Sequence, residues 1–203
     1  MIEVIVIIDY GSGNLRSIQK SVSKFYRDVR ISDDLNVIEK ADAIILPGVG
    51  AFGDAANKLI EGGLFNYLKV KLLKTPTLGI CLGMQLLFTY SEETNGVRGL
   101  NIIPGKVVKL KKLSSIRIPH TGWNRIIPVS YPYFFGYAYF NHSFYCIPED
   151  PKIIVSYVHH GLSIPVIIMK KNIIGTQFHP EKSKNTGNAV LKYFVSLIRR
   201  GSL

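Results

Sequence analysis

The chain has 203 residues, 47% of them hydrophobic and 19% charged, with a formal net charge of +11. This length and composition exclude a disordered chain and predict a single domain over residues 1–203 with a core of its own. The positive charge does not indicate a nucleic-acid partner, because the lysine-rich segments 69–74 and 106–112 alternate lysine with valine and leucine, as a solvated helix or strand edge does.

Neither membrane insertion nor secretion is indicated. The apolar start lacks basic residues and turns polar at Asp9, too early for a signal peptide, and no later apolar run approaches the roughly 18 residues of a membrane span. The two cysteines, Cys81 and Cys146, stand in different contexts, which argues against a disulfide framework. We therefore expect a cytoplasmic protein.

In the first half of the chain, apolar runs alternate with amphipathic segments. The runs rich in isoleucine and valine are predicted strands: residues 2–8, 29–32, 42–46 and 77–81. Between the first two, residues 14–25 carry an apolar stripe at helical spacing. Continuous apolar runs indicate strands that are buried on both faces. The alternation predicts an α/β fold with a doubly wound, mostly parallel sheet flanked by helices.

After residue 97 the pattern changes. Residues 105–110 and 123–158 show alternation, aromatic residues and proline-containing turns, which are typical of antiparallel strands. We expect these strands to pack beside the main sheet. A last apolar stripe, from about Asn188 to Arg200, predicts a helix that closes the domain.

The most informative segment runs from Thr77 to Gln85. A predicted strand leads into Gly79-Ile80-Cys81-Leu82-Gly83 and then into a predicted helix, which is the pattern of a nucleophile elbow with cysteine in place of serine. At a helix N-terminus the thiolate of Cys81 would be favoured, and the N–H of Leu82 would point at an oxyanion. A small buried cysteine between two packing glycines is the alternative. For Cys146 we expect a role in the core.

A general base is indicated near the C-terminus, where Phe178-His179-Pro180-Glu181 follows a predicted strand. Pro180 pushes His179 toward an extended conformation, and residues two apart in an extended chain face the same side. Glu181 could then hold Nδ1 of His179 and leave Nε2 free for Cys81. A surface turn is the alternative. The remaining histidines have no cysteine or carboxylate at ligand spacing, so no metal is expected.

Two glycine-rich loops follow predicted strands, at residues 9–14 and 47–53. Their glycines would let the backbone approach a ligand and present N–H groups to negative charge. The second loop lacks the Gly-Lys-Ser/Thr ending of a phosphate-binding loop, and the first lacks the third glycine of a dinucleotide loop. No nucleotide cofactor is expected.

Taken together, these motifs resemble a known family. The segments 9–14, 47–52, 79–85, 120–124 and 178–183 are similar to the glutaminase subunits of imidazole glycerol phosphate synthase, which are class I glutamine amidotransferases of histidine biosynthesis. The resemblance implies a catalytic triad of Cys81, His179 and Glu181. It further implies an oxyanion hole made by Gly48, Val49, Gly50 and the N–H of Leu82, and a glutamine pocket that includes Gln85, Glu93 and Ser143.

Some details of that resemblance stay open. Glu92 is an alternative to Glu93, and Thr121 departs from the methionine associated with this position, which puts only a local packing contact in doubt. The resemblance also implies a heterodimer with a (β/α)8-barrel cyclase that receives the ammonia, with Lys182 and Asn124 at the interface. A glutaminase for anthranilate, aminobenzoate or pyridoxal phosphate synthesis, or a flavodoxin-like binding module, are the alternatives.

Overall fold

The computed structural model describes residues 4–112 and 116–200. The strands of its larger sheet are β1 (Ile5–Ile8), β2 (Val29–Ser32), β3 (Ala43–Leu46), β4 (Thr77–Ile80), β7 (His120–Pro128), β8 (Gly136–His142), β10 (Ile154–His159), β11 (Ser163–Lys170) and β12 (Ile173–Thr176). The smaller sheet contains β5 (Tyr90–Ser91), β6 (Gly105–Lys109) and β9 (Phe144–Pro148). The helices are α1 (Leu15–Val22), α2 (Leu35–Glu39), α3 (Phe52–Glu61), α4 (Leu64–Lys74), α5 (Leu82–Leu86) and α6 (Lys184–Arg200), with short 3-10 helices η1 (Pro151–Ile153) and η2 (Pro180–Lys182).

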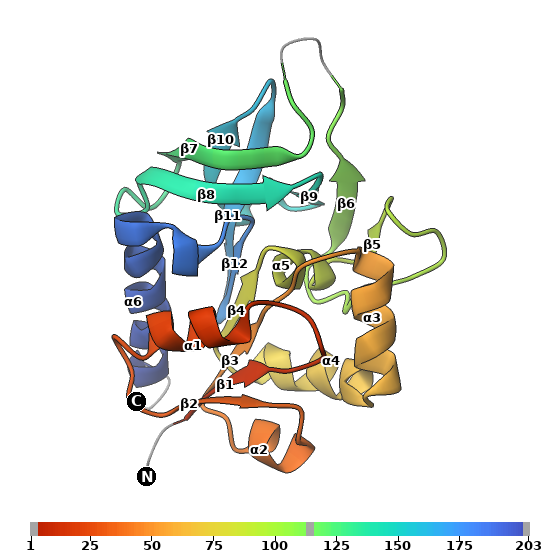
Figure 1. The fold of residues 1–203 in the computed structure, drawn as a ribbon, viewed down its shortest axis with the longest axis vertical. Helices are drawn as coiled ribbons and strands as arrows, with labels where there is room; N and C mark the ends of the chain where they lie inside the picture. Colours follow the sequence, from red (N-terminus) through yellow and green to blue (C-terminus); the bar gives the residue numbers. More distant parts are fainter. Residues whose placement is uncertain (1–3, 113–115, 201–203) are drawn as a thin grey trace.

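The larger sheet has nine strands in the order β2-β1-β3-β4-β12-β11-β10-β7-β8 (Figure 1). From β2 to β12 all neighbours are parallel, and from β12 to β8 all are antiparallel. The sheet is therefore mixed, and its parallel half runs from the edge strand β2 to β12. β12 is the strand at which the two halves meet.

Helices cover both faces of the parallel half, as a doubly wound sheet requires. One core cluster joins the strands to α1 and α6, and a second joins them to α2, α3, α4 and α5. Figure 1 shows α1 and α6 on one side of the strands and α3 and α4 on the other. Strands β1, β3 and β4 are buried along their whole length because both of their faces are covered.

The predicted strands of the first half are present, with β1 beginning at Ile5; residues 2 and 3 of the predicted run 2–8 lie outside the described residues. The antiparallel region differs from the prediction. Strands β7, β8 and β10 extend the main sheet instead of packing beside it, and only β5, β6 and β9 form a separate sheet. The alternation pattern identified antiparallel strands but does not encode which edge they join.

The last helix was predicted from about Asn188, but α6 begins at Lys184. The prediction was wrong because Lys184-Asn185-Thr186 carries no apolar stripe; this first turn is held by its contact with η2. At Gly187, an added Cβ would run into the backbone of Pro180, so the helix packs on η2 as closely as a glycine allows. Within the described residues no helix has the length and apolar character needed to cross a membrane.

Candidate active site

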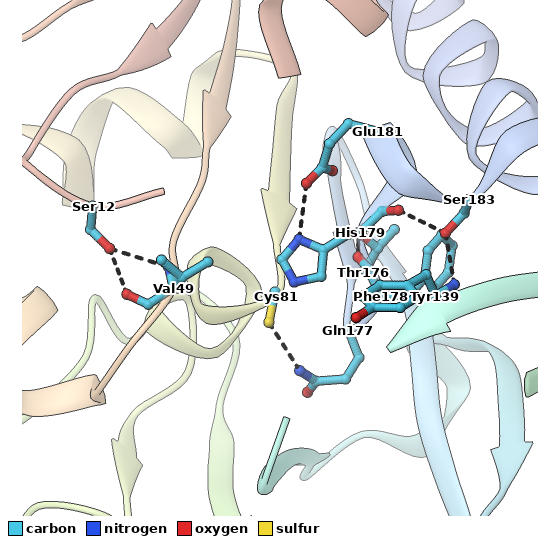
Figure 2. Close-up of polar contacts among 10 residues, drawn as sticks. All are labelled: Ser12, Val49, Cys81, Tyr139, Thr176, Gln177, Phe178, His179, Glu181 and Ser183. Atoms are coloured by element: carbon cyan, nitrogen blue, oxygen red, sulfur yellow. Dashed lines mark hydrogen bonds and ion pairs between the residues drawn. The ribbon is translucent and has the colours of Figure 1, made fainter. Parts of the chain in front are cut away.

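Cys81 and His179 meet because their strands are neighbours. In the parallel pairing of β4 with β12, Ile80 lies opposite Thr176, and the N–H of Cys81 donates to the carbonyl of Thr176 at 2.7 Å. Both chains leave the sheet at the same edge, where the carboxyl ends of parallel strands form the usual position for a site. Figure 2 shows the sulfur of Cys81 beside the imidazole of His179, and Cys81 is one of the two side chains that raise the pKa of this ring.

The backbone of Cys81 is strained in the way expected of a nucleophile elbow. Its φ of 54° and ψ of −106° lie in a region that residues with a side chain rarely adopt. The flanking glycines permit the turn: a Cβ on Gly79 would lie 2.9 Å from Cα of Met84, and one on Gly83 would collide with the carbonyl of Leu46. Strain concentrated at one cysteine argues against the alternative of a simple packing residue.

The predicted helix after Cys81 is shorter than expected, since α5 has five residues and ends at Leu86. Cys81 occupies its N-cap position, but so short a helix provides only a small dipole. The neighbouring imidazole is therefore the main electrostatic influence on the sulfur. Cys146 lies on β9, fully buried in the second core cluster, as predicted, and burial raises the pKa of its thiol.

His179 and Glu181 form a buried pair. Nδ1 of His179 lies 3.0 Å from Oε1 of Glu181, and the two side chains are 6% and 2% exposed. The predicted hydrogen bond is thus present, but the local reason given for it was wrong. His179 is extended, whereas Pro180–Lys182 forms the 3-10 helix η2, so a turn and not an extended chain brings the carboxylate to the ring.

The loop that carries this pair is fixed to β8. The N–H of His179 donates to the carbonyl of Tyr139 at 3.2 Å, and the N–H of Tyr139 donates to Oγ of Ser183 at 2.9 Å. Oγ of Ser183 in turn donates to the carbonyl of His179 at 2.7 Å (Figure 2). Because two of these hydrogen bonds join the loop to β8 and the third closes the loop on itself, the backbone that carries the imidazole is fixed.

Cys81 and Glu181 together raise the pKa of His179. Within the described part of the chain, Oε2 of Glu181 is buried without a hydrogen-bond partner, so His179 is the cation that balances the carboxylate. Burial by itself lowers the pKa of His179, but the hydrogen bonds to Cys81 and Glu181 and the negative charges of both outweigh it and raise this pKa to about 10. The raised pKa favours the protonated form of the His179 imidazole, which lies between the Glu181 carboxylate and the Cys81 sulfur.

A cavity of about 250 Å³ opens at Cys81. Seven residues singled out from the sequence line it: Val49, Gly50, Cys81, Leu82, Gln85, Glu93 and Ser143. Gly48, His179 and Glu181 are not among the described residues that line it. Gly48 and His179 lie one contact further away, against Leu82 and Cys81, and Glu181 lies one contact beyond His179.

The cavity distinguishes Glu93 from Glu92. Glu93 lines the cavity, and its Oε2 accepts from the N–H of Phe52 at the start of α3, at 2.7 Å. Glu92 is exposed and its carboxylate accepts from the N–H of Lys109 at 3.4 Å. Gln85 is buried, and its Nε2 donates to the carbonyl of Phe144 at 3.1 Å and to Oε1 of Gln177 at 3.4 Å.

The loop after β3 does not present all of its N–H groups to the cavity. The N–H of Val49 donates to Oγ of Ser12 at 3.2 Å, and the same hydroxyl donates to the carbonyl of Val49 at 2.6 Å (Figure 2). Ser12 lies in the first glycine-rich loop, which follows β1. In this conformation the Val49 peptide is therefore bonded to Ser12 and is not free to bind an oxyanion.

Sequence reasoning assigned no role to several residues at this site. Pro119, Asn141, His142 and Phe144 also line the cavity. Nδ1 of His142 donates to the carbonyl of Phe144 at 2.9 Å, and Nδ1 of His120 lies 3.1 Å from Nε2 of His142. Burial first, and then the charge of a neighbouring histidine, lowers the pKa of His142 to about 3 and that of His120 to about 4.

These two histidines are therefore neutral and serve as hydrogen-bonding groups. No group of three or more His, Cys, Asp and Glu residues suited to a metal ion occurs among residues 4–112 and 116–200. The signal that could have found His142 is its position next to Ser143, at the end of a predicted antiparallel strand.

The arrangement of fold and site agrees with comparison to known proteins. The family model described as glutamine amidotransferase class-I matches residues 6–197. The chain therefore belongs to the class I glutamine amidotransferase family. Solved structures agree at the level of the fold: a glutamine amidotransferase aligns with a TM-score of 0.76 at 14% identity, over 96% of this chain and 98% of that one.

Among curated proteins the similarity is more specific. The imidazole glycerol phosphate synthase subunit HisH of Syntrophotalea carbinolica is 44% identical, over 94% of this chain and 98% of the relative. The subunit of the same name from Methanothermobacter thermautotrophicus is 43% identical, over 97% of this chain and 100% of the relative. Within its class, the chain thus falls in the HisH family.

The charge arrangement predicts how His179 titrates. In the folded chain an NMR titration of its imidazole should give a pKa near 10, above the usual 6.5, and Cys81→Ala should lower it because the sulfur anion is removed. Because the pKa of His179 is higher in the folded chain than in the unfolded chain, protonation of His179 stabilises the fold. This stabilisation should be complete below about pH 6.5 and be lost as the pH rises through about 10. An unshifted pKa in the unmodified chain would contradict the arrangement.

Proposed function

We propose that this protein is the glutaminase subunit of imidazole glycerol phosphate synthase, which hydrolyses glutamine to glutamate and ammonia and supplies the ammonia to a cyclase subunit in histidine biosynthesis. The observation that carries the proposal is the imidazole of His179, which lies between the buried Glu181 carboxylate and the sulfur of a strained Cys81 at the wall of a cavity. The curated relatives support this pathway over glutaminases of anthranilate, aminobenzoate or pyridoxal phosphate synthesis.

In the proposed mechanism, the thiolate of Cys81 attacks the carboxamide carbon of glutamine. The C–N bond of the tetrahedral intermediate breaks as His179 delivers its proton to the departing nitrogen, which leaves ammonia and a glutamyl thioester. His179, now neutral, takes a proton from water, and the hydroxide so formed displaces the sulfur to give glutamate. Glu181 keeps the ring oriented through Nδ1 and stabilises its charge in each step.

The glutamine would be held by groups on the cavity wall. Since Nε2 of Gln85 is engaged with the protein, its Oε1 is the atom that can accept a hydrogen bond from the substrate. The carboxylate of Glu93 suits the ammonium group of glutamine, and Ser143, between His142 and Phe144, lines the same cavity. No cofactor is required for this chemistry.

The proposed oxyanion hole consists of Gly48, Val49, Gly50 and the N–H of Leu82. To contribute, the Val49 peptide must leave Ser12 and turn toward Cys81. Gly50, with a φ of 100° and no atom close to where a Cβ would lie, is a suitable pivot for this rotation. The bond to Ser12 therefore favours a resting state of low activity.

A (β/α)8-barrel cyclase is the partner we propose, in a heterodimer. Ammonia released into water would be protonated, so the two active sites need a closed connection. A candidate docking surface, here called the aromatic face, consists of Trp123, Tyr133, Phe135 and Tyr137, which are 48%, 77%, 67% and 60% exposed. Such a concentration of exposed aromatic side chains is typical of an interface.

The aromatic face lies next to the proposed triad. It surrounds a depression of about 410 Å³ that is also lined by Ser183 and Lys184. Nζ of Lys184 lies 5.7 Å from the ring centroid of Trp123, and Nζ of Lys182 lies 5.4 Å from that of Tyr139. Since Ser183 also bonds to the carbonyl of His179, a partner on this face would rest against the loop that carries the base. Lys182 and Asn124 remain proposed interface residues.

Two broader proposals complete this description. We take residues 1–203 as one domain, which is supported by the single nine-stranded sheet shared by both core clusters. A cytoplasmic location suits a biosynthetic subunit whose two cysteines are both free.

Loss of the nucleophile should abolish catalysis. Cys81→Ala is expected to reduce glutamate formation from glutamine by at least about 1,000-fold, since nucleophile and base act as a unit. The matched control is Cys146→Ala, which removes the other buried thiol and should lower the melting temperature but retain turnover. Glutaminase activity that survived in Cys81→Ala would refute the proposed mechanism.

Release of the Val49 peptide should raise basal activity. Ser12→Ala removes the hydroxyl that bonds both groups of this peptide, so glutamine turnover by the isolated subunit should rise up to about tenfold, the scale of one or two hydrogen bonds. Ser12→Thr keeps a hydroxyl and serves as the control. Equal turnover in Ser12→Ala and the unmodified subunit would show that this bond does not restrain the loop.

The aromatic face should bind the cyclase. Tyr137→Glu places a charge on this face and is expected to weaken binding to a purified cyclase at least about tenfold by calorimetry, because a charge is poorly tolerated in an interface core. Val70→Glu introduces the same charge at another exposed apolar position, on α4, and should bind normally. Unchanged affinity in Tyr137→Glu would place the interface elsewhere.

A further inference from the structure

Gln177 is a buried amide that the proposed mechanism does not use. It follows β12, its side chain is 0% exposed, and its Nε2 lies 3.8 Å from the sulfur of Cys81. Figure 2 shows this amide and the ring of His179 approaching the sulfur from different directions. We propose that Gln177 is a further catalytic residue, whose N–H donates to the sulfur of Cys81 and stabilises its anion; this rests on Cys81 being the nucleophile.

The orientation of the Gln177 amide follows from its neighbours. The carbonyl of Phe144 can only accept a hydrogen bond, so the atom of Gln85 that lies 3.1 Å from it must be the nitrogen Nε2. The same nitrogen faces the side chain of Gln177 at 3.4 Å, which therefore presents its oxygen Oε1. The remaining polar atom of Gln177 is Nε2, and it faces the sulfur. A flipped amide would place two oxygens or two nitrogens together.

The carbonyl of Phe144, which determines the orientation of both amides, is itself fixed. The carbonyl of Phe144 also accepts from Nδ1 of His142 at 2.9 Å, and β9, to which Phe144 belongs, pairs along its length with β6. Two donors on one strand carbonyl leave it little freedom. Gln85 is thus a positioning residue in this arrangement, since it acts on the sulfur only through Gln177.

A neutral donor stays unchanged while the protonation of His179 changes during the reaction. His179 gives up its proton as ammonia departs, whereas the amide of Gln177 keeps its hydrogen through both half-reactions. When water attacks the thioester, the C–S bond breaks and its electron pair returns to the sulfur, and Gln177 donates to the anion that forms. Its N–H therefore favours the thiolate before the attack on glutamine and again as glutamate leaves.

The test is the pH dependence of alkylation at Cys81 by iodoacetamide, followed by mass spectrometry of the peptide that contains this residue. In Gln177→Met, which has a similar length but no donor, the rate at pH 7 should fall about tenfold and the pH of half-maximal rate should rise about one unit. In the complex with the cyclase, kcat for glutamine should fall with little change in KM, because the lost interaction is with the sulfur. If Gln177→Met fails to fold by circular dichroism, Gln177→Glu, which keeps the shape, is expected to show the same direction of change.

The matched control is Thr176→Val, one residue earlier. Thr176 is equally buried and its Oγ1 donates to the carbonyl of Phe178 at 3.1 Å, so this variant should lose stability but keep the alkylation profile. A profile in the Gln177 variants equal to that of the unmodified chain would overturn the role of Gln177 while leaving Cys81 as the nucleophile. Glutaminase activity that persisted in Cys81→Ala would instead overturn the proposed function itself.

Discussion

The parallel pairing of β4 with β12 brings together two segments that are almost a hundred residues apart in the chain. Thr77 to Ile80 lie opposite Ile173 to Thr176, and each strand ends at the same edge of the sheet. The sulfur of Cys81 and the imidazole of His179 then face each other with little further folding. β12 is also the strand at which the sheet changes from parallel to antiparallel pairing, so its C-terminal loop contacts both halves.

Burial strengthens the electrostatic interactions among Cys81, His179 and Glu181. Glu181 has no cation but His179 to balance it within the described residues, and His179 in turn lies against the sulfur. In water such charges would be screened, but in a site that is almost closed to solvent they hold the imidazole protonated. The strain at Cys81 and the missing Cβ atoms at Gly79 and Gly83 are the local conditions under which the sulfur can reach this position.

Two features that we propose to be regulatory lie close to Cys81 and His179. The hydroxyl of Ser12 bonds both groups of the Val49 peptide, and the aromatic face lies against the loop of His179. A partner bound there would be placed to influence the base, and a rotation at Gly50 would complete the proposed oxyanion hole. Low activity alone and high activity in the complex would follow from this geometry.

The sequence by itself determined the strands of the parallel half and the elbow at Cys81; it also indicated that Glu181 lies near His179, although the turn η2 and not an extended chain brings them together. These features depend on residues near one another in the chain, because the spacing of apolar residues and the positions of glycine and proline determine local structure. It could not determine that β7, β8 and β10 extend the main sheet, or that α6 begins at Lys184, because contacts with β11 and η2 decide both.

Only the tertiary structure distinguished Glu93 from Glu92, bonded the Val49 peptide to Ser12, and turned the amide of Gln177 toward the sulfur. Each of these depends on which polar atom lies nearest in space. A hydrogen bond between residues distant in the chain produces no spacing pattern that could be recognised in the sequence. The sequence therefore indicates which residues reach the site, and packing decides which of their atoms face the cavity.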